Sequence, residues 1–266
     1  LDFTSQRVIS VCSMDRWVGN TAVVTGASSG IGSAICVELA NAGINVVGLA
    51  RRAAPIEALK SQVKGNGTIT ARQCDVSCAE EVAATFKWIE DSFGCVHIMI
   101  NNAGVLLQGG ITGTFSYSLC CKDVLSVIDI NLKGPILCAR HAIASMRSND
   151  FDGHVVNINS IAGHYVPMSS KFNVYTSTKY GITGFSAGLL NELSDHNNKI
   201  KVTSVSPGLV RTGMDVAADD STPALRPKDV ADAVLYVLST PPTVNVSLAY
   251  ILTISQATKL EKSRFF

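Results

Sequence analysis

Residues 25–32 read Thr-Gly-Ala-Ser-Ser-Gly-Ile-Gly, and they lie between two segments of opposite character. The β-branched apolar run Thr21–Val24 before them is typical of a buried strand. After them, Ile31, Ile35 and Leu39 recur every four residues, which is typical of a helix. The glycines therefore lie at a strand-to-helix turn, where a βαβ unit presents backbone N–H groups and a helix N-terminus to a pyrophosphate.

The glycines of this turn have separate roles in that interpretation. Gly26 permits the tight turn, Gly30 lets the backbone approach the phosphates, and Gly32 lets the helix lie close to the sheet. A glycine-rich turn alone is a weak signal, because ordinary loops contain it too; the flanking strand and helix supply the context that the motif requires. The predicted cofactor contacts of the turn are Gly26, Ser28, Ser29, Gly30, Ile31 and Gly32.

The bulk composition fits one large α/β domain. The chain has 266 residues, of which 47% are hydrophobic and 16% charged, enough for a substantial core. A net charge of +1 favours neither nucleic acid nor an anionic membrane, and no apolar run is long enough to span a bilayer. Met14 would be a natural start, so we expect an extension over residues 1–13 and a single dinucleotide-binding domain over residues 14–266.

Eight cysteines are scattered along the chain at spacings that match no zinc or redox motif. Most of them lie in apolar stretches. We therefore expect buried free thiols in a cytoplasmic protein, and no metal site.

Strands and helices alternate along most of the chain. This alternation predicts a Rossmann-type, doubly wound parallel sheet with helices on both faces. The later strands are expected at Asn45–Leu49, Thr68–Gln73, Val96–Ile100, His154–Ile158, Lys201–Val205 and within Ala249–Ile254. The clearest helices are Glu80–Phe93, Leu119–Met146, Tyr175–Leu193 and Asp229–Leu238.

The end of the second strand indicates which nucleotide binds. A carboxylate there would bond the adenosine ribose and repel a 2′-phosphate, but this chain has Arg51 and Arg52 instead. Guanidinium groups match a phosphate, so NADP(H) is favoured; alternatively, both arginines only solvate a helix start. Asp75, followed by Val76, ends the third strand and is a candidate acceptor from the adenine amino group or a helix cap. Small residues end the fourth strand and would let the chain pass beneath the cofactor, namely Asn102, Ala103 and Gly104.

Four scattered residues carry the expected chemistry. Ser160 ends the fifth strand, Tyr175 and Lys179 share one face of a helix, and Asn131 lies inside the preceding long helix. A free tyrosine has a pKa of about 10, and a nearby ammonium favours its phenolate. Tyr175 would then be the general acid/base and Lys179 would lower its pKa and hold the nicotinamide ribose. Ser160 would bind the substrate oxygen.

Alternatives stay open for these residues. Asn131 would hold a water that passes the proton onward, or it would only bond to nearby backbone. Tyr175 and Lys179 would otherwise be surface residues, since Tyr-x-x-x-Lys alone is common.

These motifs together resemble those of the short-chain dehydrogenase/reductase family, over about residues 17–242. They are Thr25–Gly32, Asn101–Gly104, Asn131, Ser160, Tyr175, Lys179 and Pro207-Gly208. The resemblance implies that Asn131, Ser160, Tyr175 and Lys179 form a catalytic tetrad. It also implies cofactor contacts from Pro207, Gly208, Val210 and Thr212, with Thr212 holding the nicotinamide carboxamide.

A closer resemblance is to the farnesol dehydrogenase-like branch of insects, which is similar to vertebrate steroid-reducing relatives. Its motifs are Met14–Gly19, Gly48–Arg52, Asn157–His164, Asp229–Val234 and Ser239–Pro242. The resemblance implies NADP-dependent oxidation of isoprenoid alcohols such as farnesol, or reduction of keto-steroids. The residues before Met14 and the C-terminus from Val244 depart from the family pattern, and that tail leaves the oligomer contacts open.

Three apolar segments are expected to line the substrate pocket. They contribute Leu106 and Leu107, then Ile161, Tyr165, Val166, Pro167 and Met168, then Met214 and Val216 from a long connection after the sixth strand. An apolar wall implies an uncharged, lipophilic alcohol or carbonyl as substrate. His164 would either touch the ligand oxygen or have a structural role in its loop.

The helix that begins near Tyr175 contains Gly181, Gly184 and Gly188. A mid-helix glycine costs about 1 kcal/mol relative to alanine, which close packing of a partner helix would offset. We therefore expect a homodimer or homotetramer. A protein that binds the cofactor without turnover is the alternative to an enzyme, and four intact catalytic residues argue against it.

Overall fold

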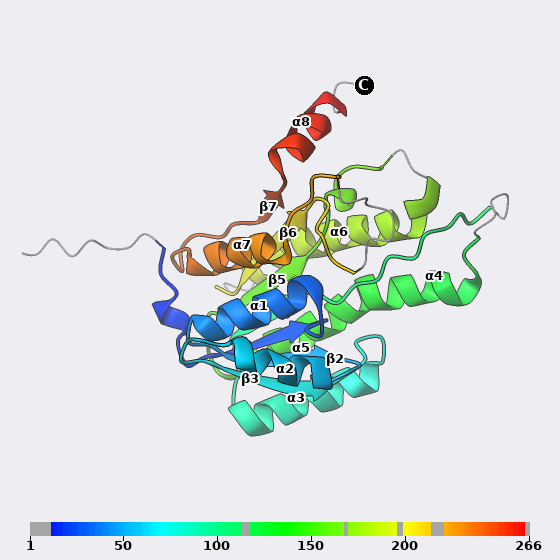
Figure 1. The fold of residues 1–266 in the computed structure, drawn as a ribbon. Coiled ribbons are helices and arrows are strands. Elements are labelled where there is room, and N and C mark those ends of the chain that lie inside the picture. The colour runs from blue at the N-terminus through cyan, green and yellow to red at the C-terminus, as the bar shows by residue number, and fades with distance from the viewer. Residues whose placement is uncertain (1–11, 113–117, 168–169, 196–198, 214–220, 264–266) are drawn as a thin grey trace, which may run out of the picture.

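The computed structural model describes residues 12–112, 118–167, 170–195, 199–213 and 221–263 (Figure 1). Its described residues form one parallel sheet of seven strands in the order β3-β2-β1-β4-β5-β6-β7. The predicted doubly wound α/β fold is therefore confirmed. The strands are β1 (Thr21–Thr25), β2 (Asn45–Ala50), β3 (Thr68–Gln73), β4 (Ile98–Asn101), β5 (His154–Ile158), β6 (Lys201–Pro207) and β7 (Leu248–Ile251).

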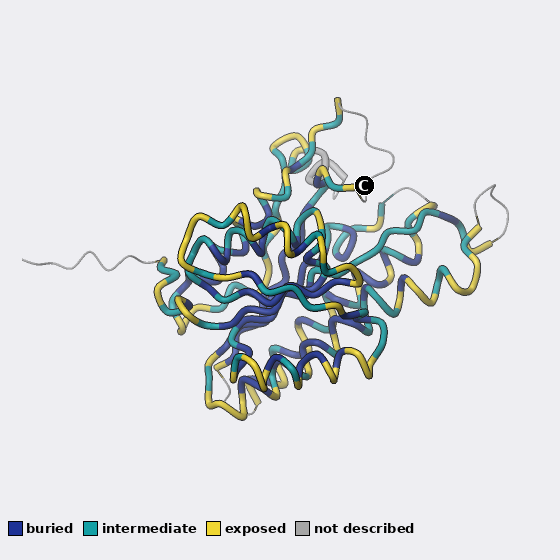
Figure 2. The backbone as a smooth tube through the Cα atoms, turned by 60° about the horizontal axis from the view of Figure 1, so that its bottom comes forward, coloured by how far each residue is buried: buried dark blue, intermediate teal, exposed yellow. Residues whose placement is uncertain are grey.

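Helices cover both faces of the sheet, and the buried residues follow the sheet through the middle of the molecule (Figure 2). One face is covered by α1 (Gly30–Asn41), α2 (Ala54–Ala58), η2 (Leu59–Gln62) and α7 (Pro227–Ser239). The other is covered by α3 (Ala79–Phe93), α5 (Gly134–Ser148) and α6 (Asn173–Asp195). The remaining elements are η1 (Asp15–Trp17), α4 (Cys121–Ile128), η3 (Asp129–Lys133), η4 (Ile161–Gly163), η5 (Ser170–Phe172) and α8 (Ile254–Ser263).

The two layers of core follow from the two-residue period of the strands. In β1, Ala22 and Val24 pack beneath α1 and α7, whereas Val23 packs against α3 and α5 on the opposite face. Ile98 and Met99 of β4 divide in the same way. Since both faces are covered, these strands have consecutive apolar residues, Ala22–Val24 and Ile98–Ile100, rather than an alternation of apolar and polar residues.

The predicted helix Leu119–Met146 is wrong as a single element. The structure has α4 and α5 there, joined by the π-helical turn η3. Pro135 lies in the first turn of α5 and has no N–H, so the α-helical bond from residue 135 to the Asn131 carbonyl cannot form. A π-helical turn at this point places Asn131 outside regular α-helix.

Several strand boundaries also differ from expectation by one or two residues, for example at the end of β6, which extends to Pro207. The fourth strand begins at Ile98 rather than Val96, because the Val96 N–H bonds to Ser145 Oγ instead of to a neighbouring strand. The last strand ends at Ile251, and Ile254 already begins α8. That helix projects from the body of the molecule beyond β7, which is the edge strand (Figure 1).

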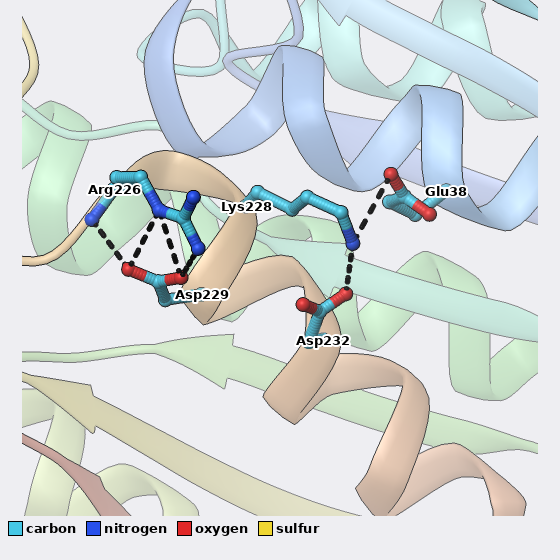
Figure 3. A network of polar contacts seen from close by, with 5 residues as sticks. All are labelled: Glu38, Arg226, Lys228, Asp229 and Asp232. Carbon is cyan, nitrogen blue, oxygen red and sulfur yellow. Dashed lines mark hydrogen bonds and ion pairs between the residues drawn. The ribbon is translucent and has the colours of Figure 1, made fainter.

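The helices α1 and α7 lie side by side on one face of the sheet, and Lys228 of α7 links them (Figure 3). Its Nζ lies 3.5 Å from Glu38 Oε1 of α1 and 2.6 Å from Asp232 Oδ1 of α7. At the start of α7, Arg226 donates to Asp229 at 2.7 Å. Exposed pairs of this kind contribute at most about 1 kcal/mol each, so apolar packing holds the two helices on the sheet.

Candidate active site

A cleft of about 830 Å³ opens at the carboxyl ends of the strands. Its walls come from the segments that directly follow β1, β2, β3, β4, β5 and β6. The strand order reverses between β1 and β4, which is the topological switch point where doubly wound sheets bind ligands.

The glycine turn is fixed to the segment after β4. Gly26 has a φ of +66°, a conformation that favours glycine. A Cβ at Gly32 would collide with the carbonyl oxygen of Gly26 and the amide of Asn102, so only glycine lets α1 start this close to the turn. Asn102 Nδ2 donates to Thr25 O at 2.9 Å, and Thr25 Oγ1 accepts from the N–H groups of Asn102 and Ala103, both at 3.0 Å.

The N-terminus of α1 suits an anion. Ser29 is its N-cap, yet the Ser29 side chain makes no capping bond, and the first turn contains no acidic residue. The first N–H groups of a helix have no partner within the helix and carry partial positive charge. Gly26, Ser28, Ser29, Gly30 and Ile31 all line the cleft here, so a pyrophosphate fits this position. Gly32 supports the turn from behind and is not part of the wall.

The two arginines lie at the end of the cleft that follows β2. Arg51 and Arg52 follow β2, are exposed, and line the cleft with Asp75 and Val76. Partial burial raises the pKa of Asp75, but hydrogen bonds from Ser77 and the charge of Arg51 outweigh it, so the pKa lies below its ordinary value. Asp75 does not cap α3, whose N-cap is Cys78; its Oδ1 accepts instead from the N–H of Ser77 at 2.9 Å and the Ser77 hydroxyl at 2.7 Å.

Asn131 is buried, with 1% of its surface exposed, and its amide is occupied. Oδ1 accepts from Val105 N at 2.8 Å, and Nδ2 donates to Val105 O at 2.9 Å and to Thr178 Oγ1 at 3.3 Å. The side chain therefore joins the segment after β4 to α6 through the backbone of Val105 and the hydroxyl of Thr178.

Lys179 is the buried cation of the site. Its residue is 6% exposed, and Nζ donates to Ile158 O at 3.0 Å and lies 5.7 Å from the centre of the Tyr175 ring. Burial lowers the pKa of Lys179 to about 8. Ser160, Tyr175 and Lys179 all line the cleft, and Ser160 Oγ accepts from Ala162 N at 3.1 Å.

Thr183 joins the segment that carries Ser160 to the helix that carries Tyr175, and sequence analysis did not single it out. It lies one turn after Lys179 on α6, donates to Gly163 O at 2.9 Å and accepts from Asn159 Nδ2 at 3.0 Å. Since Asn159 and Gly163 flank the segment that begins with Ser160, Thr183 fixes that segment against the helix that carries Tyr175.

The residues after β6 close the end of the cleft opposite Arg51 and Arg52. Pro207, Gly208, Val210 and Thr212 all line it. Thr212 also reaches the glycine turn, because a Cβ built at Gly30 would lie 3.3 Å from Thr212 Cγ2.

The apolar wall is formed partly by the expected residues. Leu106, Leu107, Ile161 and Pro167 line the cleft, whereas Tyr165 and Val166 do not, and Val166 is exposed. Met168, Met214 and Val216 lie outside the described residues. Leu209, from the long connection after the sixth strand, also lines the cleft, and further apolar lining residues that the sequence did not indicate are Ile130 and Phe172.

His164 takes the structural position that was one of its two alternatives. Its Nε2 lies 3.0 Å from Ser206 Oγ, and its ring packs edge-on against Tyr250 of β7 at 5.0 Å. It is not among the residues that line the cleft.

Residues 20–222 match the short chain dehydrogenase family. The chain belongs to the short-chain dehydrogenase family. It is 44% identical over 237 residues to farnesol dehydrogenase of Aedes aegypti, covering 88% of this chain and 95% of that relative. It is 39% identical over 253 residues to the mouse dehydrogenase/reductase SDR family member 11, covering 88% of this chain and 94% of that protein.

Solved structures of the family superpose well on this chain. A metagenomic short-chain oxidoreductase in complex with NADP is 30% identical, with a TM-score of 0.75 over 89% of this chain and 97% of that one. A serine dehydrogenase complexed with NADP⁺ is 28% identical, with a TM-score of 0.78 over 89% of this chain and 96% of that one.

Membership makes this short-chain dehydrogenase an oxidoreductase that acts on alcohols or carbonyls. Across the described ranges, no helix is long and apolar enough to cross a membrane. The expectation of buried thiols is right for Cys36, Cys74, Cys95 and Cys138 and wrong for the others, of which Cys78 is half-buried. Exposed thiols are found at Cys12, Cys120 and Cys121.

Proposed function

We propose that the protein is an NADP(H)-dependent oxidoreductase that interconverts a lipophilic alcohol and its carbonyl, with an isoprenoid alcohol such as farnesol as substrate. The observation that carries the proposal is the meeting of Ser160, Tyr175 and buried Lys179 in one cleft whose adjoining wall is apolar. The 44% identity to a relative named farnesol dehydrogenase supports the isoprenoid class.

The cleft offers a fitting surface for NADP(H). The uncapped N-terminus of α1 would bind the pyrophosphate, and Arg51 and Arg52 would bind the 2′-phosphate. Asp75 would accept from the adenine amino group through its remaining lone pairs. Pro207, Gly208, Val210 and Thr212 would contact the nicotinamide end. The dinucleotide, when bound, accepts or supplies the hydride.

The protein's own residues would move the accompanying proton. Tyr175 takes the hydroxyl proton of the alcohol in oxidation and returns it to the carbonyl oxygen in reduction. Lys179, as a cation 5.7 Å from the Tyr175 ring centre, favours the phenolate. Ser160 donates to the substrate oxygen and orients it. Asn131 would hold the segment after β4 in place, and a water relay at this residue is part of the proposal.

A coupled absorbance assay tests the proposal. Farnesol would be offered with NADP⁺ and with NAD⁺, and a set of keto-steroids with NADPH and NADH. We expect farnesol oxidation with NADP⁺, and we expect Tyr175→Phe to lower kcat about 1,000-fold while NADPH affinity stays within twofold of the wild type. Steroid reduction without farnesol turnover would contradict the isoprenoid assignment. NADPH binding without turnover of any substrate would favour the non-catalytic alternative.

Two broader features belong to the same proposal. Helix α6 would pack against a second copy of the chain in a homodimer or homotetramer. The free thiols are compatible with a reducing cytoplasm, where we place the protein.

A further inference from the structure

The segment between β6 and α7 leaves the sheet and returns through a narrow neck, formed by Leu209–Arg211 and Thr222–Leu225. Val210 and Leu225 form a parallel bridge, Arg211 N donates to Leu225 O at 2.7 Å, and Leu225 N donates to Leu209 O at 2.9 Å. Since Leu209 and Val210 line the cleft, the position of the neck sets the shape of the cleft beside Gly208 and Thr212.

Gln256, in the first turn of α8, spans the two sides of this neck. Its Nε2 donates to Leu209 O at 3.3 Å on one side and to Pro223 O at 2.9 Å on the other. Its Oε1 accepts from Thr253 N at 3.1 Å, which fixes the orientation of the amide. The C-terminal helix is thereby joined to both sides of the neck, Leu209–Arg211 and Thr222–Leu225, through one side chain.

The same side chain lies against the turn that follows β6. Gly208 donates its N–H to Ile251 O at 2.8 Å, and a Cβ at Gly208 would lie 2.5 Å from Gln256 Oε1 and 2.8 Å from Leu252 Cδ2. The C-terminal segment therefore occupies the space behind Gly208, which lines the cleft, while Gln256 itself does not reach the cleft.

We propose that Gln256 is a positioning residue, which holds Gly208 and the neck in the shape that binds the nicotinamide end of the dinucleotide. This inference rests on the proposed cofactor function. It gives the C-terminal segment, which departs from the family pattern, a role in nucleotide binding. The essential chemistry is donation, because two carbonyl oxygens converge on one amide nitrogen.

Two substitutions separate donation from packing. Gln256→Met keeps the length of the side chain and removes all of its amide hydrogen bonds. Gln256→Glu keeps the shape and the acceptor, but an ionised carboxylate cannot donate and would face two carbonyl oxygens. A protonated carboxyl has one O–H donor, so the Glu variant recovers part of the contact at low pH. Thr258→Ala, an exposed position one helical turn from Ile254 in α8, is the matched control.

Calorimetric titration with NADP⁺ measures the effect on binding. We expect Gln256→Met to raise Kd about tenfold at pH 8. We expect Gln256→Glu to raise it further at pH 8 and to recover part of this loss, relative to the wild type, as the pH falls to 5, a recovery that the Met variant does not show. A Kd within twofold of the wild type for the Met variant, or a Glu variant that binds as tightly as Met at every pH, would overturn the proposal.

Trypsin cleavage after Arg211 tests the neck without any cofactor. Between Lys201 and Lys228, Arg211 is the cleavable basic residue, since Pro227 follows Arg226. We expect both Gln256 variants to be cut there several times faster than the wild type and Thr258→Ala, at temperatures where all four proteins are folded by circular dichroism. Equal cleavage rates would refute the positioning role of Gln256, whereas failure of the wild type to bind NADP⁺ would refute only the proposed function.

Discussion

Lys179 lowers the stability of the cofactor-free protein. Its residue is only 6% exposed, and its ammonium donates to a carbonyl oxygen rather than pairing with an acid. Burial lowers its pKa from 10.5 to about 8 in the folded state. Above about pH 10.5 the amine is neutral in both the folded and the unfolded protein, and its burial carries no charge penalty. The penalty grows as the pH falls from about 10.5 to 8 and is complete below pH 8, where the ammonium is buried on folding.

Replacing this residue is therefore expected to stabilise the protein while harming its chemistry. Lys179→Met should raise the Tm of the cofactor-free protein at pH 7, by the equivalent of at most about 3 kcal/mol. The difference should shrink as the pH rises towards 10.5, which thermal melts across that range would show. Lys122→Met, at an exposed position of α4, is the control and should leave the Tm unchanged. A Met variant less stable than the wild type at pH 7 would contradict the assigned cost of burial.

At the scale of elements, the end of β2 is expected to select the nucleotide. Charge-assisted bonds from Arg51 and Arg52 to a 2′-phosphate should be lost in the double substitution Arg51→Ala with Arg52→Ala. We expect NADPH affinity to fall about 10- to 100-fold and NADH affinity to change little, as measured by fluorescence titration. Arg147→Ala, an exposed arginine in the last turn of α5, controls for the loss of positive charge. Equal losses for both nucleotides would rule out the 2′-phosphate contact.

Elements with a clear period were predictable, and elements shaped by a single distant contact were not. The strand His154–Ile158 and the helix that carries Tyr175 follow from local pattern alone. The break at Asn131 does not, because the apolar pattern of Leu119–Met146 continues through it while Pro135 and the bonds to Val105 disrupt the helix.

The candidate site divides in the same way. Ser160, Tyr175 and Lys179 were recognisable from residue type and spacing. Thr183, Phe172 and Gln256 were not, since each acts through partners that only the folded chain brings near, such as Pro223 for Gln256. A single sequence reports which groups are present, whereas their hydrogen-bond partners are set by tertiary structure.

At the scale of the whole molecule, parallel strands explain how separated motifs come together. Gly26, Arg51, Asn102, Ser160 and Gly208 are far apart in the chain, yet each directly follows a strand or lies within two residues of its end. Because all strands point the same way, their carboxyl ends share one edge of the sheet, and the cleft forms there.

The exposed face of α6 carries glycines that no contact within the described part of the subunit explains. Gly184 and Gly188 of α6 are exposed, and a Cβ at either would meet nothing within 4 Å, so contacts within the subunit do not offset these mid-helix glycines. Helix α4, which packs against α6, exposes Leu125, 58% accessible. Exposed glycines on one helix and an exposed apolar side chain on the helix packed against it are typical of a surface where helices of two copies pack closely.

Light scattering coupled to size exclusion tests this surface. The wild type should elute at twice or four times the subunit mass, and Gly184→Arg with Gly188→Arg should lower that mass, because two long charged side chains would keep the helices apart. The open space at both positions lets the substituted subunit fold, which circular dichroism would verify. Ala83→Arg, at an exposed position of α3 on a different helix, should keep the wild-type mass. A wild type that elutes at the subunit mass would show that the glycines are not there for a partner helix.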